Sequence, residues 1–169
     1  RGFFEGGDVQ GFNTVKVSLD ANSSANITIN GTLQLGYFGK SVGAGDFNND
    51  GNKDMAVANT GSNTISAFFG NGAGGFGAAQ TLNVGSSPVG IATGDFDNNG
   101  LIDIACTNAA SNTVSVILSN GFNTFLPAVH FPTNTNPVDL CIADFNSDGK
   151  KDIAVACYGS YSVALLLNT

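Results

Sequence analysis

The acidic residues of this chain are concentrated in three short stretches, and their spacing suits the binding of a hard cation. Nine of the 13 acidic residues lie in "DFNNDGNKD", "DFDNNGLID" and "DFNSDGKKD", which begin at Asp46, Asp95 and Asp144. A solvated acidic tail would be contiguous, whereas these clusters recur at a fixed interval in a chain that carries few other charges. Alternate residues of a tight loop can direct their oxygen atoms to one centre. We therefore expect each stretch to be a cation site.

Each stretch offers the same kinds of oxygen ligand at the same positions. Positions 1, 3 and 5 carry carboxylates or amides, position 6 is a glycine that permits a sharp turn, and position 9 is again an aspartate. The carbonyl of position 7 brings the total to about six oxygens, which suits calcium better than magnesium. The expected ligands are Asp46, Asn48, Asp50, Asn52 and Asp54 in the first loop, Asp95, Asp97, Asn99, Leu101 and Asp103 in the second, and Asp144, Asn146, Asp148, Lys150 and Asp152 in the third. Three Ca²⁺ sites that stabilise the fold are predicted.

Two other interpretations of these loops have to be weighed. An EF-hand loop needs a glutamate at position 12 and flanking helices, but position 12 is Val57, Cys106 or Val155, within β-rich runs. The EF-hand interpretation therefore fails. Asp, Asn and Gly are also ordinary turn formers, so one loop alone would not distinguish a turn from a metal site. Recurrence of acid or amide at positions 1, 3, 5 and 9 in three copies favours calcium.

The three stretches belong to an internal repeat of 49 residues. At the same distance after each loop stand "SNTISAFF", "SNTVSVIL" and "SYSVALLL". Each unit has short apolar runs separated by Gly, Asn and Ser, which indicates four strands, in the middle unit at about 90–95, 103–108, 113–118 and 126–132. Four strands in a repeat of this length are typical of a β-propeller blade. The sequence predicts an all-β fold of four-stranded antiparallel blades, each with a nine-residue calcium loop between its first and second strands.

The repeat divides the chain into one half-blade and three blades. Residues 1–36 form an N-terminal half-blade with strands at 13–19 and 32–36, residues 37–86 form blade 1, residues 87–135 form blade 2, and residues 136–169 form blade 3 without its fourth strand. This is an incomplete propeller with open edges, which tend to recruit other strands. The chain is then a fragment of a longer propeller, or it closes by strand exchange between copies, or, least favoured because of the twist required, it closes on itself.

Two of the repeat units resemble a known family. "DFNNDGNKDMAVANTGSNTISAFFGNGAGGFG" and "DFNSDGKKDIAVACYGSYSVALLLN" closely resemble FG-GAP and VCBS repeats, the calcium-loop blades of integrin-α-like propellers. "FFGNGAGGFG" resembles the FG-GAP stretch itself, while "ILSNGFNTF" in the second unit departs from it. The resemblance is strong over 36–169 and weak over 11–35. It implies an extracellular or cell-surface propeller, in a family whose propellers have about seven blades.

Composition argues against several other functions. The formal net charge is −7 and the six basic residues are scattered, so no stripe follows a nucleic-acid backbone. No apolar run approaches the roughly 20 residues of a membrane span. His130 is the one histidine and falls on an expected outer strand without a nucleophile or acid beside it, so we expect no enzyme. Cys106, Cys141 and Cys157 lie in apolar strand-like runs and are expected to be buried, with a Cys141–Cys157 bridge left open.

The remaining hypotheses are adhesion or self-assembly into a surface polymer or oligomer, and, as an alternative, carbohydrate binding. The partner would be a second copy of the chain, a surface protein or a glycan. Tyr37, Tyr158 and Tyr161 are candidates for a lectin-type site, but Trp is absent and Tyr37 occurs in only one unit. Three N-x-[ST] sequons lie between the two N-terminal strands and begin at Asn22, Asn26 and Asn30. The loop that carries them is expected either to be exposed and glycosylated or to be an ordinary polar loop.

Overall fold

The computed structural model describes residues 13–17, 27–31 and 38–169. Within these ranges every regular element is an antiparallel strand, apart from one 3₁₀ turn at Tyr158–Ser160. Short apolar runs rich in β-branched residues, interrupted by Gly and Asn, favour this outcome because they fit a pleated sheet and break helices. The all-β prediction is confirmed. No helix in the described ranges is long and apolar enough to cross a membrane.

Three sheets follow one another along the chain, and we call them blades. Blade 1 is a meander of β3 (Phe38–Gly45), β4 (Asp54–Asn59), β5 (Thr64–Phe68) and β6 (Gln80–Asn83). Blade 2 has the order β12-β9-β8-β7, built from β7 (Pro88–Gly94), β8 (Asp103–Asn108), β9 (Thr113–Ile117) and β12 (Val129–Pro132). Blade 3 contains β13 (Pro137–Ala143), β14 (Asp152–Cys157) and β15 (Ser162–Leu166).

Blade 2 differs from the prediction at its outer strand. The expected strand at 126–132 begins only at Val129, and the chain before it forms a separate small hairpin of β10 (Ser119–Gly121) and β11 (Thr124–Phe125). Pro127 has no N–H to donate to a sheet ladder, which explains why the strand starts after it. Phe122 and Asn123 both adopt positive φ at the tip of this hairpin.

A further hairpin lies near the N-terminus. β1 (Asn13–Val17) agrees with the strand expected at 13–19 and pairs with β2 (Ile27–Gly31). The polar loop expected over this segment therefore contains a strand, because Ile27, Thr28 and Ile29 are β-branched and favour it. The fourth strand expected at 32–36 lies outside the described residues.

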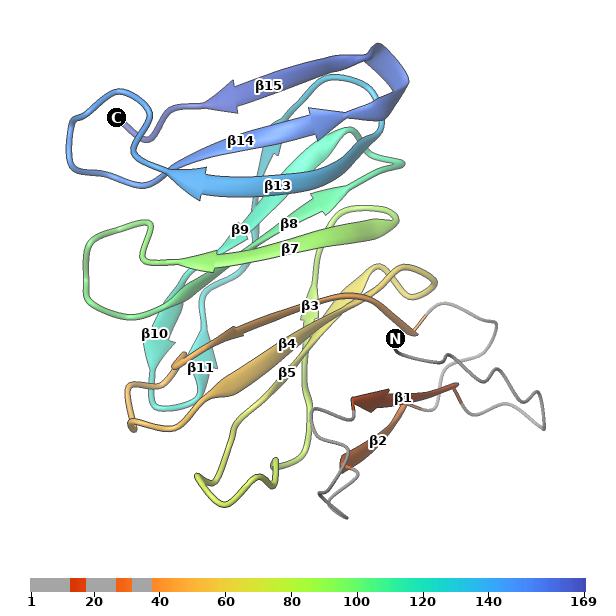
Figure 1. The fold of residues 1–169 in the computed structure, drawn as a ribbon, viewed down its shortest axis with the longest axis vertical. Helices are drawn as coiled ribbons and strands as arrows, with labels where there is room; N and C mark the ends of the chain where they lie inside the picture. The colour runs from red at the N-terminus through yellow and green to blue at the C-terminus, as the bar shows by residue number, and fades with distance from the viewer. Residues whose placement is uncertain (1–12, 18–26, 32–37) are drawn as a thin grey trace.

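The three blades are arranged side by side through their first strands. β7 lies beside both β3 and β13, and the sheets fan out from this line (Figure 1). The N–H of Ile91 donates to Ser41 Oγ (3.2 Å), and Thr93 Oγ1 donates to the carbonyl of Ala44 (2.8 Å). Gly43 permits this approach, since a Cβ there would lie 2.5 Å from Ile91 Cγ2. In the described part of the chain the blades do not close into a ring.

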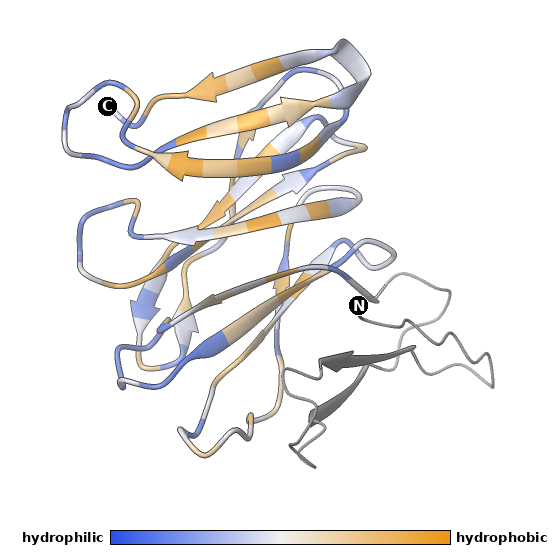
Figure 2. Cartoon of the chain, viewed as in Figure 1, coloured by the Kyte–Doolittle hydropathy of each residue, from blue (hydrophilic) through white to orange (hydrophobic). Residues whose placement is uncertain are grey.

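Each pair of neighbouring blades encloses an apolar core. Between blades 1 and 2 the buried side chains are Phe47, Ala56, Ile65, Ile104, Cys106 and Ile117. Between blades 2 and 3 they are Phe96, Ala105, Val114, Leu140, Ile153, Val155 and Cys157. Figure 2 shows hydrophobic residues along the strands and hydrophilic residues in many of the loops that connect them. Burial of these facing surfaces is the main force that holds adjacent blades together.

All three cysteines are free thiols. Cys106 and Cys157 are buried, as expected, but Cys141 is exposed. The bridge between Cys141 and Cys157 is absent because Cys141 is paired with Ala154, three residues from Cys157. Side chains three residues apart on one strand point to opposite faces of the sheet, so the two sulfur atoms face away from each other.

Candidate metal centre

The three acidic loops have the same backbone shape, each joining the first and second strands of its blade. The fourth residue of each loop adopts a left-handed conformation, with φ of 60° at Asn49, 59° at Asn98 and 63° at Ser147. The glycine at position 6 also has positive φ, for example 86° at Gly100. A Cβ at Gly100 would meet nothing within 4 Å, so the turn needs glycine for its backbone angle and not for space.

The aspartate at position 1 organises each loop through its own carboxylate. In the second loop Asp95 accepts the backbone N–H of Asn99 (3.1 Å) and that of Gly100 (2.8 Å) on its two oxygens. The other two loops repeat both bonds: Asp46 accepts the N–H groups of Asp50 and Gly51, and Asp144 accepts those of Asp148 and Gly149. The loop is therefore folded around this carboxylate, with its oxygens at the centre.

The second loop brings three carboxylates together. One oxygen each of Asp95, Asp97 and Asp103 lies within 4.8 Å of the others. These are positions 1, 3 and 9, and among the described residues no other three acidic, histidine or cysteine groups come this close. In the first and third loops position 3 is an amide, Asn48 or Asn146, so the same arrangement offers two carboxylates and one amide oxygen. Such sets of hard oxygen donors suit calcium.

The aspartate at position 9 is buried and holds the loop to the sheet. Asp103 is fully buried, and its oxygens accept the N–H of Phe96 (2.8 Å) and of Ser119 (2.8 Å). Asp54 and Asp152 are buried in the same way; Asp54 binds the N–H of Phe47 and Gly70, and Asp152 binds those of Phe145 and Asn168. One carboxylate thus ties the loop to the end of the third strand of its own blade.

Burial and neighbouring charges set the protonation of this centre. Burial raises the pKa of Asp103 to about 6, although the Phe96 and Ser119 N–H groups act in the opposite direction; Asp97 and Asp95 raise it further. Without a cation, the Asp103 carboxyl therefore keeps its proton up to a higher pH than an ordinary aspartate does, because burial raises its pKa. A bound cation would compensate the three negative charges, which is the fit expected of a calcium centre.

A family model described as FG-GAP-like repeat matches residues 46–106 and again 95–155. The chain belongs to the FG-GAP-like repeat family. Each match begins at the first aspartate of one loop and runs into the second strand of the following blade, so it spans a repeat and its junction with the next. No curated protein matches the chain at a significant level.

The fifth position of the FG-GAP-like loops differs from the simplest ligand scheme. Asp50 accepts the N–H of Asn52 (2.8 Å) on one oxygen and the side-chain amide of Asn48 (2.9 Å) on the other. The N–H of Asn52, followed by the Asn48 amide, lowers the pKa of the Asp50 carboxyl, which keeps it charged. Asp148 has the equivalent bonds to Lys150 and Asn146, and the pKa of its carboxyl is lowered in the same way.

In the second loop position 5 is Asn99. It accepts the N–H of Leu101 (2.7 Å) and donates its amide to Asp97 (3.0 Å). The structure therefore shows Asn52, Leu101 and Lys150 as N–H donors to position 5. Their role as carbonyl ligands stays a prediction.

Neighbouring loops are joined by one residue that the sequence analysis missed. Ser119 donates its N–H to Asp103 of blade 2 and its hydroxyl to the carbonyl of Phe47 in the first loop. Asn168 does the same one repeat later, since its N–H binds Asp152 and its amide binds the carbonyl of Phe96 (2.6 Å). Gly70, Ser119 and Asn168 are spaced by 49 residues, so the repeat could have indicated that these three positions are equivalent.

A second contact links the first loop to blade 2. The side-chain amide of Asn48 donates to Asn123 Oδ1 (2.6 Å) at the tip of the β10–β11 hairpin. Asn48 is an expected ligand, so its orientation depends on the neighbouring blade. Nothing in the local sequence of the loop indicates this partner, because the two residues are 75 positions apart.

The other candidate residues lie away from these loops. Asn30 is in β2, whereas Asn22 and Asn26, like Tyr37, lie outside the described residues. His130 is exposed on β12, the outer strand, as expected, and its Nδ1 lies 2.9 Å from Ser115 Oγ. Ser115 is fully buried and also accepts the amide of Asn108, so the contact between His130 and Ser115 joins β12 to β9.

Proposed function

We propose that the chain is a calcium-binding module of an extracellular propeller-type protein, in which Ca²⁺ occupies each of the three acidic loops. The observation that carries the proposal is the convergence of Asp95, Asp97 and Asp103, one of them fully buried, in a loop whose shape recurs twice more. Clustered carboxylates repel one another unless a cation lies among them. Calcium would therefore stabilise each loop and, through Ser119 and Asn168, the junction between blades.

Calcium dependence can be measured on the intact chain. At a free calcium concentration of about 100 times Kd, each site would add about 2.7 kcal/mol to the free energy of unfolding. For a chain of this size, that corresponds to a rise in Tm of about 5 to 10 °C per site. We expect chelation to lower Tm accordingly and titration calorimetry to resolve three sites, with Mg²⁺ at the same concentration as the control. A melting curve indifferent to both chelator and calcium would remove the metal from the proposal.

The biological role that we propose is adhesion, or self-assembly into a surface polymer or oligomer by strand exchange. Membership of the FG-GAP-like repeat family supports an integrin-like or adhesin-type propeller. The outer edge of β15 supports strand exchange, because no described strand pairs with it. In this scheme the N-terminal residues 1–36 of one copy pair with β15 of another. We assign the chain no catalytic role, no nucleic-acid partner and no membrane insertion.

A second candidate function is carbohydrate binding. Tyr158 and Tyr161 are 66% and 90% exposed, and their ring centroids are 6.1 Å apart. Exposed aromatic faces of this kind can stack on sugar rings, and the chain would then act as a lectin-type propeller. Binding to immobilised glycans that is lost in Tyr161→Ala, with calcium affinity unchanged, would favour this function over adhesion through protein contacts.

A further inference from the structure

The β10–β11 hairpin of blade 2 reaches the first acidic loop at two neighbouring residues. Ser119, at the start of the hairpin, donates its hydroxyl to the carbonyl of Phe47, which is position 2 of the loop. Asn123, at the tip, accepts the side-chain amide of Asn48 at position 3 (2.6 Å). In Figure 1 the hairpin lies beside the loop that joins β3 to β4. One hairpin therefore contacts both the backbone and an expected ligand side chain of another blade's loop.

These contacts hold the side-chain amide of Asn48 in one orientation. Its NH₂ group has two acceptors, Asp50 Oδ2 (2.9 Å) and Asn123 Oδ1 (2.6 Å). Its Oδ1 accepts the N–H of Asp50 (3.1 Å), so this oxygen is turned into the loop. A carbonyl oxygen has two lone pairs, and Asn48 Oδ1 therefore keeps one of them for a cation. Asn123 thus favours the orientation that Asn48 needs as a ligand.

Asn123 stands where the second repeat unit departs from the FG-GAP stretch. In blade 1 the equivalent segment is also closed by a bridge, between Gly70 and Phe76. The residue 49 positions before Asn123 is Gly74, with φ of 83°, and Asn123 itself has φ of 59°. Glycine and asparagine both adopt a left-handed conformation readily, so the turn is kept in either case. Only the asparagine adds a side chain that can reach the neighbouring loop.

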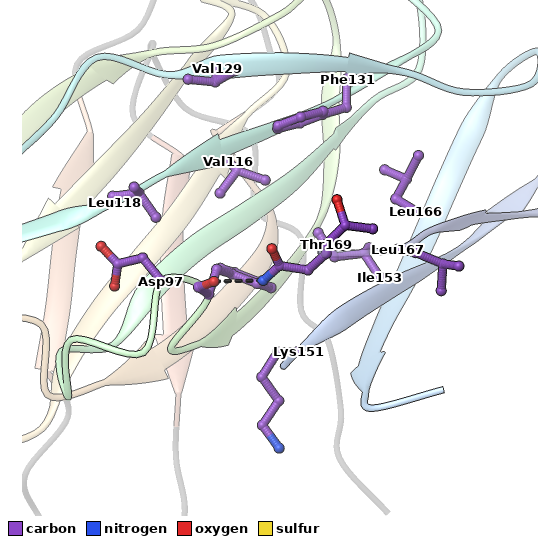
Figure 3. A pocket seen from close by; sticks show the side chains of 12 residues that line it. Asp97, Val116, Leu118, Val129, Phe131, Lys151, Ile153, Leu166, Leu167 and Thr169 are labelled. Atoms are coloured by element: carbon purple, nitrogen blue, oxygen red, sulfur yellow. Dashed lines mark hydrogen bonds between the residues drawn. The ribbon is translucent and has the colours of Figure 1, made fainter. Parts of the chain in front are cut away.

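The side-chain contact also requires an amide at position 3 of the loop. The second loop has the equivalent of the backbone contact, because Asn168 donates its amide to the carbonyl of Phe96 (2.6 Å) at the side of a pocket between blades 2 and 3 (dashed line in Figure 3). Position 3 of that loop is Asp97, which accepts the amide of Asn99 (3.0 Å) and as a carboxylate has no N–H to donate. A side-chain contact of the same kind is therefore impossible at the second loop.

We propose that Asn123 is a positioning residue of the first calcium site, supplied by the neighbouring blade, and that calcium in this loop and the β10–β11 hairpin stabilise each other. The inference rests on the proposed calcium binding and describes how one of the three sites is regulated. Coupling between two sites is reciprocal, so the hairpin contact strengthens calcium binding and calcium in turn holds the hairpin. The backbone that carries Phe122, which is 96% exposed beside Asn123, is held by the same contact.

Asn123→Gly tests the proposal, because it introduces the residue that blade 1 has at this position and keeps the left-handed backbone. Calcium is titrated into the intact chain, and NMR of the amide groups of the position 6 glycines follows the three loops separately; they are Gly51, Gly100 and Gly149. We expect the variant to weaken calcium binding to the first loop about fivefold, as the loss of one hydrogen bond predicts. Binding to the second and third loops should not change.

Two further variants show whether the effect passes through Asn48. In a chain that carries Asn48→Asp, position 3 has no N–H to donate, so the addition of Asn123→Gly should leave calcium binding to the first loop unchanged. Asn136→Gly is the matched control. Asn136 also has positive φ (54°), but it precedes β13, at the end of blade 3 opposite the acidic loop that follows this strand. Its replacement should leave calcium binding to all three loops unchanged.

Hydrogen exchange measures the same coupling in the opposite direction. In the unaltered chain, calcium should slow the exchange of the backbone amides at the hairpin tip, those of Asn123 and Thr124, and Asn123→Gly should reduce this effect. Should Asn123→Gly fail to fold, Asn48→Asp should reduce it instead, since this variant removes the other partner of the bond and introduces the residue that the second loop has at position 3.

The outcomes separate this inference from the proposed function. Weaker calcium binding confined to the first loop, and absent when Asn48 is already replaced, supports the inference. An unchanged first loop, an equal loss at all three loops, or a loss that persists with Asn48→Asp overturns the inference and leaves the proposed calcium binding intact. If the unaltered chain binds no calcium at any loop, the proposed function and the inference both fail.

Discussion

At the scale of single residues, the aspartate at position 9 has two tasks that its sequence position alone does not reveal. It supplies an oxygen to the acidic centre, and it anchors two backbone N–H groups that would otherwise be buried without a partner. Asp103 shows both tasks, since it is fully buried, accepts bonds from Phe96 and Ser119, and lies in the cluster with Asp95 and Asp97. Removal of its charge should therefore damage the fold even without metal.

Asp103→Asn tests this dual role. One carboxylate oxygen becomes an NH₂ group that faces a backbone N–H, which leaves a buried donor unsatisfied and should cost about 2 to 3 kcal/mol. Urea unfolding in the presence of chelator measures the change in the free energy of unfolding. The control is Asp97→Asn, because position 3 is already an asparagine in the other loops. Asp97→Asn should weaken calcium binding with little effect on the metal-free protein; equal destabilisation by both variants would contradict the assignment.

The thiols provide a second prediction at this scale. Burial raises the pKa of Cys106 to about 12, so its reactive thiolate is scarce at neutral pH, and Cys157 is also buried. Cys141 is exposed on β13. A thiol reagent such as DTNB should therefore modify one cysteine rapidly in the native protein and all three after unfolding. Rapid modification of two or more thiols in the native state would show that the buried strands are accessible.

At the scale of elements, the loops and blades are coupled through the residue that follows the third strand. Ser119 and Asn168 each bind the loop of their own blade through the backbone and the loop of the preceding blade through the side chain. The side-chain bond crosses the junction between blades, while the backbone bond stays within one. The two contributions can therefore be separated by substitution.

Ser119→Ala removes the bond between blades together with the long bond that its hydroxyl accepts from the N–H of Gly121 (3.4 Å). The N–H of residue 119 can still bind Asp103, but the carbonyl of Phe47 loses its donor, so the free energy of unfolding should fall by about 1 to 2 kcal/mol. Calcium affinity of the first loop should fall with it, as measured by calorimetry. Thr81→Ala on the exposed face of β6 serves as the control. A loss confined to the second loop would show that Ser119 acts through Asp103 alone.

Much of the element level could be predicted from the sequence because the repeat is strong and its strands are short and apolar. The strands expected at 103–108 and 113–118 agree with β8 and β9 to within one residue. The errors came where local chemistry competes with the pattern. Pro127 delays the last strand of blade 2, and β-branched residues at 27–29 form a strand inside an expected polar loop.

The convergence of acidic residues in the second loop could be predicted from the sequence, but the contacts around the loops could not. The spacing of Asp95, Asp97 and Asp103 predicts convergence, and the structure shows it. The bonds of Asn48 to Asn123 and of Ser119 to Phe47 join residues 75 and 72 positions apart. Such contacts depend on how the blades pack, which no local pattern contains.

At the scale of the whole molecule, the three blades share one line of first strands and leave two different ends. The end formed by blade 3 exposes large apolar side chains, among them Val163 at 71% and Leu165 at 49%. The strands of this blade are among the more hydrophobic in Figure 2. Exposed apolar side chains beside an unpaired edge are the features on which the proposed strand exchange depends. The exposure of these side chains depends on how the blades pack, and the prediction for the oligomeric state starts from it.

Strand exchange requires the N-terminal residues, so deletion of residues 1–36 should abolish assembly. We expect light scattering of the intact chain to give a mass that is a multiple of 17.2 kDa, and scattering of the shortened chain to give a single copy. The loops of all three blades remain in the shortened chain, so its calcium response reports whether it is folded. Tyr161→Ala, which alters an exposed residue at the blade 3 end but leaves the N-terminus, should assemble as the intact chain does. Assembly that survives the deletion would exclude strand exchange through residues 1–36, because the free edge of β15 would then be covered by something else.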